Sequence, residues 1–504
     1  MEYSFYIGLI LTTTVLTCLF AAREEFFRAG VAGCTTLAFA RAAQLAGAGL
    51  AYWHDSHYYL ASARAVAITG HLDRPQSLQW IELKGYFGWP DIQILATTIH
   101  EITTISMHTL RYVIPILFVC LTFLFLWFTY GQFAGWGAGC IASLGTLMLD
   151  PFFRYFVQFH GQSIGVTFGS LFLGTVIFVT LRQQMSPTTY FRYLILFSVV
   201  SLGFLFSHRF SILIIGVALL GSYVTGDILT QLSERILEDS RGGYYIPGAA
   251  LPAALLFGVY VIYRGEEFFV WGIAQLTQVT DVGGSGPTQT TGRSWIDYPP
   301  LVLKALVPAL SLIGVWAIIK DRLTARPWLT LACTFGAITI PFTIANPRGV
   351  SRIILFVYIF IGGLCSVSVA VALDSQREWV EWGIPAIITL IVLLGTLGGS
   401  VPGLVDHSTN LGNDPFQNTP PIQSQAPAAG EFIDEYKIER IEAGFWGRVV
   451  ATRYGKVPIP VVDGVRYNNV PYFVYDSARE TPPDGSLVYT NGRIEIVRRS
   501  GNNV

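Results

Sequence analysis

The chain has 504 residues, of which 52% are hydrophobic and 13% charged, and its mean hydropathy is +0.50. Charged residues make up about a quarter of a typical soluble domain, so this composition excludes an ordinary soluble globular protein. The formal net charge of −1, without any basic tract, gives no sign of a nucleic-acid partner. All six cysteines lie inside apolar runs, which argues against a disulfide framework.

Apolar runs long enough to cross a lipid bilayer recur along the first 400 residues. A helix needs about 20 apolar residues to cross the hydrocarbon layer, and we expect about twelve such spans. They fall near residues 4–21, 30–52, 109–130, 135–149, 162–181, 193–207, 210–229, 245–263, 299–319, 327–345, 351–373 and 382–401. The predicted fold class is therefore an all-α polytopic bundle over residues 1–401, embedded in the cell membrane.

Basic residues in the short connections predict the orientation of the bundle. They gather in alternate connections, at Arg23 and Arg28, Arg182 and Arg192, Arg235 and Arg241, Lys320 to Arg326, and Arg377. Cytoplasmic loops are enriched in Lys and Arg, so we expect these connections inside. The N-terminus, a first loop at 54–108, a later loop at 264–298 and everything after residue 401 then lie outside.

The hydrophilic tail predicts a small α+β domain on the outer, extracytoplasmic side. Its first part, residues 402–430, is expected to be a linker without regular structure, because it is rich in Pro, Gln and Asn. Apolar residues at helical spacing then predict a helix over Glu431–Glu442. An Asn-Gly pair between the alternating runs 486–489 and 494–498 predicts a hairpin. The domain is expected over residues 431–504.

The leading candidate site opens the first outer loop. It gathers an acid, two imidazoles and aromatic rings where the chain leaves the second span, at His54, Asp55, His57, Tyr58 and Tyr59. Ionisable groups at a membrane surface are costly unless water, a partner or a substrate meets them. Asp55 is placed to accept a proton from an incoming hydroxyl, with His54 or His57 beside it as donor or metal ligand. Alternatively, Asp55 or Ser56 caps a helix over Ser56 to Thr69 that stops at Gly70, and the two interpretations are compatible.

Arginines at the outer end of the eleventh span form a second candidate. Arg348 and Arg352 are four residues apart, so both can face one side of a helix. The guanidinium fork grips phosphate oxygens and stays charged, which suits a phosphate ligand. The alternative is that both side chains extend to the membrane interface. Two arginines outside run against the positive-inside bias, which favours a function.

Further polar residues fall in the other outer connections. Asp150 either contacts a ligand or a metal ion or, with Pro151, starts a helix. His160, His208 and Arg209 either reach the same outer cavity or form polar turns. The Gly-, Ser- and Thr-rich residues 277–295 within the loop 264–298 are either a lid over bound substrate or an unconstrained linker.

The first outer loop resembles that of the GT-C superfamily of integral-membrane glycosyltransferases, which includes protein mannosyltransferases and oligosaccharyltransferases. The matching residues are Asp55 to Ala61, followed by an Ala-rich stretch that ends at Thr69-Gly70. Tyr86 to Pro90, with Trp89, resembles the aromatic–Pro element on which this loop re-enters the membrane. Many members carry two acids close together in this loop, whereas here the acid after Asp55 is Asp73.

The resemblance implies an inverting transfer of a sugar from a polyprenyl- or dolichyl-phosphate donor to an extracytoplasmic glycan, lipid or protein. Asp55 would be the base, Arg348 and Arg352 the phosphate grip, and Tyr58, Tyr59 and Trp89 platforms for sugar or lipid. The resemblance assigns no particular cofactor and leaves a requirement for a divalent metal ion open.

Two other function classes compete with the transferase. The first is a transporter or flippase for a lipid-linked glycan, and the second is a non-catalytic membrane assembly protein. Transporters commonly show inverted repeats and charged or broken helices near the middle of the membrane. Apart from Arg41, few ionisable residues lie deep in a predicted span, and no repeat is evident. Polar groups concentrated at one face favour the enzyme.

Overall fold

The computed structural model describes most of the apolar segments and parts of the tail. The described residues are 2–48, 63, 66–67, 91–149, 152, 156, 161–182, 187–205, 209–237, 244, 246, 258, 298–345, 350–374, 387, 390, 420–438, 441–443, 461–462, 472–476, 485–491 and 494–498. The chain divides into two compact units. Unit 1 comprises residues 1–43, 116–156 and 162–402, and unit 2 comprises residues 44–115, 157–161 and 403–504.

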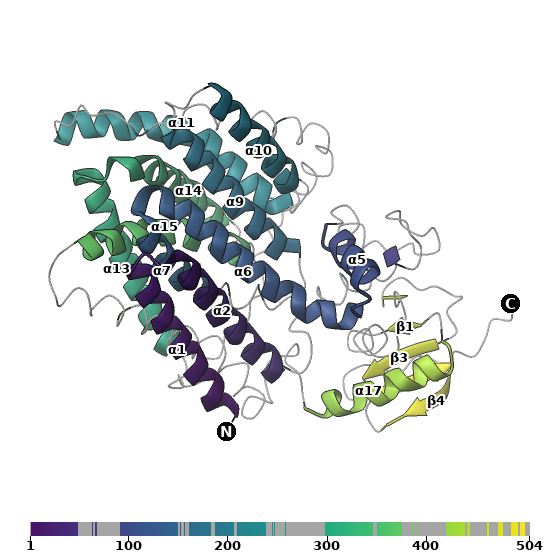
Figure 1. Cartoon of the computed structure of the whole chain (residues 1–504). Coiled ribbons are helices and arrows are strands. Elements are labelled where there is room, and N and C mark those ends of the chain that lie inside the picture. The colour runs from purple at the N-terminus through teal and green to yellow at the C-terminus, as the bar shows by residue number, and fades with distance from the viewer. Residues whose placement is uncertain are drawn as a thin grey trace. The chain divides into compact units, whose positions relative to one another are not determined.

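Unit 1 is a bundle of helices (Figure 1). Its helices are α1 (Glu2–Ala22), α2 (Phe26–Ala48), α6 (Met107–Ala134), α7 (Trp136–Leu147), α9 (Gly161–Leu181), α10 (Pro187–Leu205), α11 (Arg209–Leu237), α13 (Tyr298–Lys320), α14 (Arg326–Ala345) and α15 (Val350–Asp374), with a short 3-10 helix η3 (Leu323–Ala325). The last residues of α2 and the first of α6 belong to unit 2. Among the described residues, five helices are long and apolar enough to cross a membrane: α1, α6, α9, α11 and α15.

Ten of the predicted spans coincide with these helices to within a few residues at most boundaries. The other two, 245–263 and 382–401, lie almost entirely outside the described residues. The span predicted at 135–149 differs in kind. Its helix α7 has 12 residues, or about 18 Å, which is too short to cross a hydrocarbon layer of about 30 Å.

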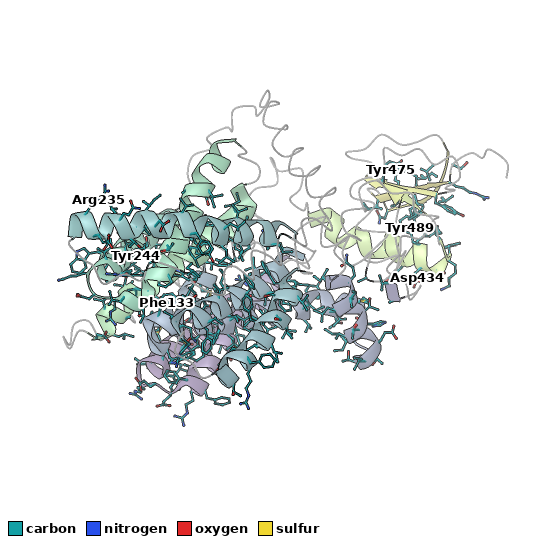
Figure 2. The ribbon with its side chains drawn as sticks, turned by 90° about the horizontal axis from the view of Figure 1, so that it is seen from above. Phe133, Arg235, Tyr244, Asp434, Tyr475 and Tyr489 are labelled. Atoms are coloured by element: carbon teal, nitrogen blue, oxygen red, sulfur yellow. The ribbon has the colours of Figure 1, made fainter. Side chains whose placement is uncertain are left out.

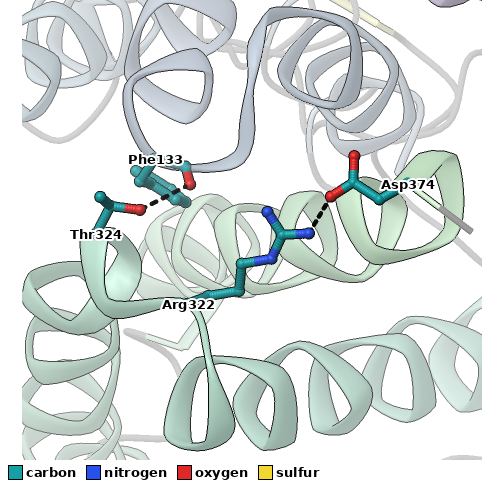
Figure 3. A network of polar contacts seen from close by, with 4 residues as sticks. All are labelled: Phe133, Arg322, Thr324 and Asp374. Carbon is teal, nitrogen blue, oxygen red and sulfur yellow. Dashed lines mark hydrogen bonds and ion pairs between the residues drawn. The ribbon is translucent and has the colours of Figure 1, made fainter.

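At one end of unit 1, which we call the basic end, polar contacts connect residues that lie far apart in the sequence (Figure 3). Arg322 forms an ion pair with Asp374 at the end of α15. Thr324 in η3 donates a hydrogen bond of 3.3 Å to the carbonyl of Phe133, in the last turn of α6. These contacts bring the last turns of α6 and α15 together with the connection that enters α14.

Basic side chains lie over aromatic rings close to the helix ends in the connections expected inside. Arg28 lies 5.9 Å from the ring centre of Phe20, and Lys320 lies 5.0 Å from that of Trp316. Long basic side chains and Trp are both favoured where the hydrocarbon layer meets water. Such pairs are expected where the membrane–water interface lies at the level of these helix ends.

Within unit 1, polar side chains join helices whose surfaces are otherwise apolar. The hydroxyls of Thr122 on α6 and Thr167 on α9 lie 2.7 Å apart. Tyr130 on α6 donates a hydrogen bond of 2.6 Å to the carbonyl of Ile359 on α15. Because lipid tails are as apolar as Leu, such hydrogen bonds and close packing hold membrane helices together.

Unit 2 contains α5 (Asp91–Thr103), in the loop 54–108. Ile92 and Ala96 on one face of α5 are buried, and Thr97 donates a hydrogen bond of 3.0 Å to the carbonyl of Ala63. Of the helix predicted from Ser56 to Thr69, the described residues are 63, 66 and 67, and all three are helical.

Unit 2 also contains one helix and a mixed sheet (Figures 1 and 2). The helix is α17 (Pro420–Glu435), and the strands are β1 (Glu442–Ala443), β2 (Val461–Val462), β3 (Tyr472–Asp476), β4 (Ser486–Thr490) and β5 (Ile494–Arg498). The strand order is β2-β1-β3-β5-β4. β1 runs parallel to β2 and β3, while β5 runs antiparallel to β3 and β4. The hairpin predicted at Asn491-Gly492 is therefore confirmed.

The linker and helix predicted for the tail were wrong in their boundaries. Residues 420–430, assigned to the linker, are helical, and the helix ends at Glu435 rather than at Glu442. Proline is tolerated in the first turn of a helix because that N–H has no partner there, so Pro420 and Pro421 do not prevent a helix, whereas Pro427 stands inside it and has no such explanation. The stop comes from Lys437, whose positive φ of 51° turns the chain so that Ile438 packs in the same core as Ile433.

Apolar side chains of α17 and the sheet form the core of this part. The cluster contains Ala429, Ile433, Ile438, Ile441, Val474, Ile494 and Ile496. Phe432 on α17 stacks on Tyr489 of β4 with ring centres 4.8 Å apart. In Figure 2, Tyr489 lies between the sheet and α17, whereas Tyr475 is drawn at the sheet.

Candidate functional site

Most of the predicted site residues lie outside the described residues. These are His54, Asp55, His57, Tyr58, Tyr59, Trp89, Asp150, His160, His208 and Arg348. Arg209 is the first residue of α11, and Arg352 is the third residue of α15. The structure thus locates the backbone of two candidates and the helices that lead to several others.

Helices α7 and α15 run antiparallel. Gly137, at the start of α7, packs against Leu373 near the end of α15. Thr146, near the end of α7, packs against Gly362. The chain therefore leaves α7 toward Asp150 while pointing to the end of the bundle at which α15 begins, the end that carries Arg352.

The other helices of unit 1 lead to the same end. The rings of Phe128 on α6 and Phe178 on α9 stack 6.1 Å apart, while Thr122 meets Thr167, so α6 and α9 run parallel and both end at the basic end. Phe178 also meets Tyr193 on α10, and Phe172 meets Phe204, so α10 is antiparallel to α9. Helix α10 consequently ends, and α11 begins at Arg209, opposite the basic end.

Helices α14 and α15 complete this arrangement. Arg322, just before α14, is paired with Asp374 at the basic end, and Phe335 meets Phe360 farther along, with ring centres 4.8 Å apart. The two helices are thus antiparallel, and the connection that contains Arg348 joins them opposite the basic end. The described helix ends beside Asp150, His208 and Arg348 therefore all point toward the end of unit 1 opposite the basic end.

One polar residue at this site was missed as a functional candidate in the sequence. Arg41 on α2 is fully buried, and its Nη2 donates a hydrogen bond of 3.0 Å to the carbonyl of Leu147, the last residue of α7. Its only sequence signal is a charge inside an apolar run. A buried charge in a membrane segment marks a functional site by default, so the signal was available.

The described residues just beyond α7 stay inside the protein. Met148 and Leu149 are buried, and the buried rings of Phe152 and Phe156 stack 6.1 Å apart. At membrane depth, irregular backbone is tolerated only where protein or a water-filled cavity surrounds it. In the part of the chain that the structure describes, no three His, Cys, Asp or Glu side chains gather into a metal site.

The arrangement of helices is shared with solved structures. The chain is similar to ArnT from Cupriavidus metallidurans bound to undecaprenyl phosphate, with 12% sequence identity and a TM-score of 0.53 over 91% of this chain and 96% of that one. It is also similar to the Archaeoglobus fulgidus oligosaccharyltransferase in its apo form, with 11% identity and a TM-score of 0.55 over 89% and 69%. The fold is GT-C-like.

The same archaeal enzyme, AglB, in complex with an inhibitory peptide and a dolichol-phosphate, matches this chain with 11% identity and a TM-score of 0.54 over 90% and 70% of the two chains. No family model and no curated protein matches the sequence. At such low identity the GT-C-like fold is what the comparison establishes. With its long apolar helices, the chain is a membrane-embedded protein.

Proposed function

We propose that this protein is a membrane glycosyltransferase that moves a sugar from a polyprenyl- or dolichyl-phosphate carrier to an extracytoplasmic glycan, lipid or protein. The observation that carries the proposal is the GT-C-like fold, which matches nearly the whole length of a structure bound to undecaprenyl phosphate. The shared direction of the described helix ends beside Asp150, His208 and Arg348, which all point away from the basic end, supports it. Residues 1–401 would form the transmembrane domain in the plasma membrane, with the loops 54–108 and 264–298 and the C-terminal part outside.

The proposed chemistry is one inverting displacement. The acceptor oxygen or nitrogen attacks the anomeric carbon, the bond from that carbon to the phosphate oxygen breaks, and the carrier leaves as its phosphate. Asp55 takes the acceptor's proton. Arg348 and Arg352 hold the phosphate as its negative charge grows, because a guanidinium stays charged and grips oxygen atoms in pairs.

Supporting roles fall to the remaining candidates. Tyr58, Tyr59 and Trp89 would be platforms for the sugar or the lipid, and His54 and His57 would orient the acceptor. Asp150 would bind sugar hydroxyls or a divalent cation, and His160, His208 and Arg209 would line the same cavity. These assignments come from residue type and position in the chain.

The test is transfer by purified protein from labelled polyprenyl-phosphate sugars. Asp55→Asn should lower turnover by about 10²- to 10⁴-fold, the usual contribution of a general base. Asp73→Asn, which changes another acid of the same loop, is the matched control and should retain full activity. Arg348→Gln and Arg352→Gln should raise the KM for the donor.

Full transfer by Asp55→Asn would refute the assigned base. Loss of glycan-lipid movement across vesicles in these variants, without any transfer by the parent protein, would favour the transporter class instead.

A further inference from the structure

Helix α7 ends deep inside unit 1. Thr146 packs against Gly362, which lies about 18 Å along α15 from its first residue, Val350. Helix α7 therefore stops well short of the level at which α15 begins. A helix that ends in the protein interior leaves carbonyl groups that must find donors there, because neither lipid nor bulk water supplies them.

The hydrogen bonds at this end account for each of the last four carbonyls. Those of Leu144, Gly145 and Thr146 accept from the backbone N–H groups of Met148 and Leu149, at 3.2–3.3 Å. The carbonyl of Leu147 accepts from Arg41 of α2, at 3.0 Å. Arg41 is thus the side chain that completes the cap of α7.

Charge reinforces this contact. The carbonyl end of a helix carries a partial negative charge of about half a unit, which favours a cation beside it. A guanidinium stays charged when buried and has five N–H donors in a fixed plane, whereas the ammonium group of lysine is a compact point charge. Removal of Arg41 would leave the carbonyl of Leu147 buried without this donor, which destabilises the end of α7.

The position of this cap in the chain gives it a functional meaning. Two described and buried residues, Met148 and Leu149, separate Leu147 from Asp150. We propose that Arg41 is a positioning residue: it fixes the end of α7 and thereby the backbone from which Asp150 is presented. This inference rests on the proposed function, because Asp150 has its role there.

The first experiment is a double-mutant cycle in the transfer assay. A misplacement of about 1 Å costs up to about 100-fold, so Arg41→Gln should lower turnover by about 10- to 100-fold and leave the KM for the donor within about twofold. Arg41→Lys keeps a charge and should recover part of the loss. If Arg41 acts through Asp150, the double variant with Asp150→Asn should be no slower than Asp150→Asn alone.

Arg326→Gln is the matched control, since Arg326 is also fully buried but lies at the start of α14, at the basic end, where its guanidinium lies 4.7 Å from the ring centre of Tyr244. Folded Arg326→Gln protein should keep its turnover. Independent, multiplying losses from Arg41→Gln and Asp150→Asn would overturn the positioning role.

A second experiment needs no enzymatic activity and separates failure of this inference from failure of the proposed function. In a chain whose native cysteines are replaced, a cysteine at position 149 should react slowly with a water-soluble maleimide, because Leu149 is buried. Addition of Arg41→Gln should speed labelling at least about tenfold, as the end of α7 loosens, whereas Arg326→Gln should not. Equal labelling rates with and without Arg41 would refute the inference even if transfer is demonstrated.

Discussion

At the scale of single residues, polar side chains specify how the helices of unit 1 join. Thr129 on α6 donates a hydrogen bond of 3.0 Å to the carbonyl of Ser170 on α9, and Trp328 on α14 donates one of 3.1 Å to the carbonyl of Phe360 on α15. An apolar helix surface packs almost equally well against lipid or against protein, whereas a buried donor needs one particular acceptor. The hydrogen bonds thus select one register among many apolar ones.

A residue-scale prediction concerns Tyr475 in β3. Burial and its hydrogen bond to Glu495 on β5 raise the pKa of Tyr475 to about 12, from 10. The folded protein therefore favours the neutral phenol more than the unfolded chain does. This contribution to stability is complete below about pH 10 and is lost as the pH rises through about 12. Thermal unfolding of unit 2, followed by a dye on a cysteine at position 487, should show this decline.

Tyr475→Phe should remove most of that decline, because Phe carries no titrating group. Tyr489→Phe is the control, because Tyr489 packs on the face of the sheet that meets α17, whereas Tyr475 belongs to a separate cluster. The hydroxyl of Tyr489 accepts a hydrogen bond of 3.2 Å from Asn491. If Tyr475→Phe and the parent lose stability equally between about pH 10 and 12, the assignment to Tyr475 is wrong.

The sequence predicted which residues could carry the chemistry better than it predicted which residues hold them in position. Asp55, Arg348 and Arg352 stand out because charges beside apolar runs are costly. The role of Arg41 could not be predicted in the same way, because its partner is a backbone carbonyl 106 positions later in the chain. A backbone acceptor leaves no signature in residue type.

At the scale of elements, the hydrophobic periodicity and composition of the sequence identified the long helices but mispredicted the length of α7 and the start of α17. Ten apolar runs became helices because each run supplies a continuous apolar surface. The length of α7 followed instead from Gly135, whose φ of 90° starts it, and from the buried turn after Leu147. The start of α17 was missed because proline-rich composition predicts a linker, although proline fits the first turn of a helix.

A prediction at this scale concerns the contact of α13 with α15. A Cβ added at Gly314 would lie 2.1 Å from the carbonyl oxygen of Leu364, a backbone atom that cannot move aside alone. Gly314→Ala should therefore destabilise the protein by about 1–3 kcal/mol, as overpacking does. Thermal unfolding of the purified protein in detergent measures the effect.

Gly336 on α14 gives the matched control, because an added Cβ would meet nothing within 4 Å. Gly336→Ala should raise stability by up to about 1 kcal/mol, since alanine loses less entropy in a helix. An equal, positive shift of Tm in both variants would show that α13 and α15 are not this close.

At the scale of the whole molecule, the orientation in the membrane is the next property to test. Lys320 and Arg322 lie at the basic end, which the positive-inside bias assigns to the cytoplasm. A cysteine at position 323, where Leu323 is 38% exposed, should stay unlabelled by an impermeant maleimide in intact cells. A cysteine at position 487, where Leu487 is 53% exposed, should be labelled. The reverse pattern would invert the proposed topology.

The whole-molecule resemblance to the GT-C superfamily came from few residues, and the GT-C-like fold is confirmed. Hydropathy and basic residues alone predict short inner connections and a large first outer loop, and the fold itself is shared at 11–12% identity. Acceptor and sugar cannot be predicted in this way, because they depend on individual side chains in the outer loops rather than on the order of spans.

The close approach of α13 and α15 limits how such a molecule can deform. Besides the contact at Gly314, Ser368 donates a hydrogen bond of 2.5 Å to the carbonyl of Leu310, and the Cys365 thiol lies 3.5 Å from that of Val307. Because hydrogen bonds to backbone carbonyls hold α13 and α15 together along two turns, the two helices tilt together as one rigid body. The isoprenoid tail of the proposed donor would therefore have to enter from the bilayer between some other pair of helices.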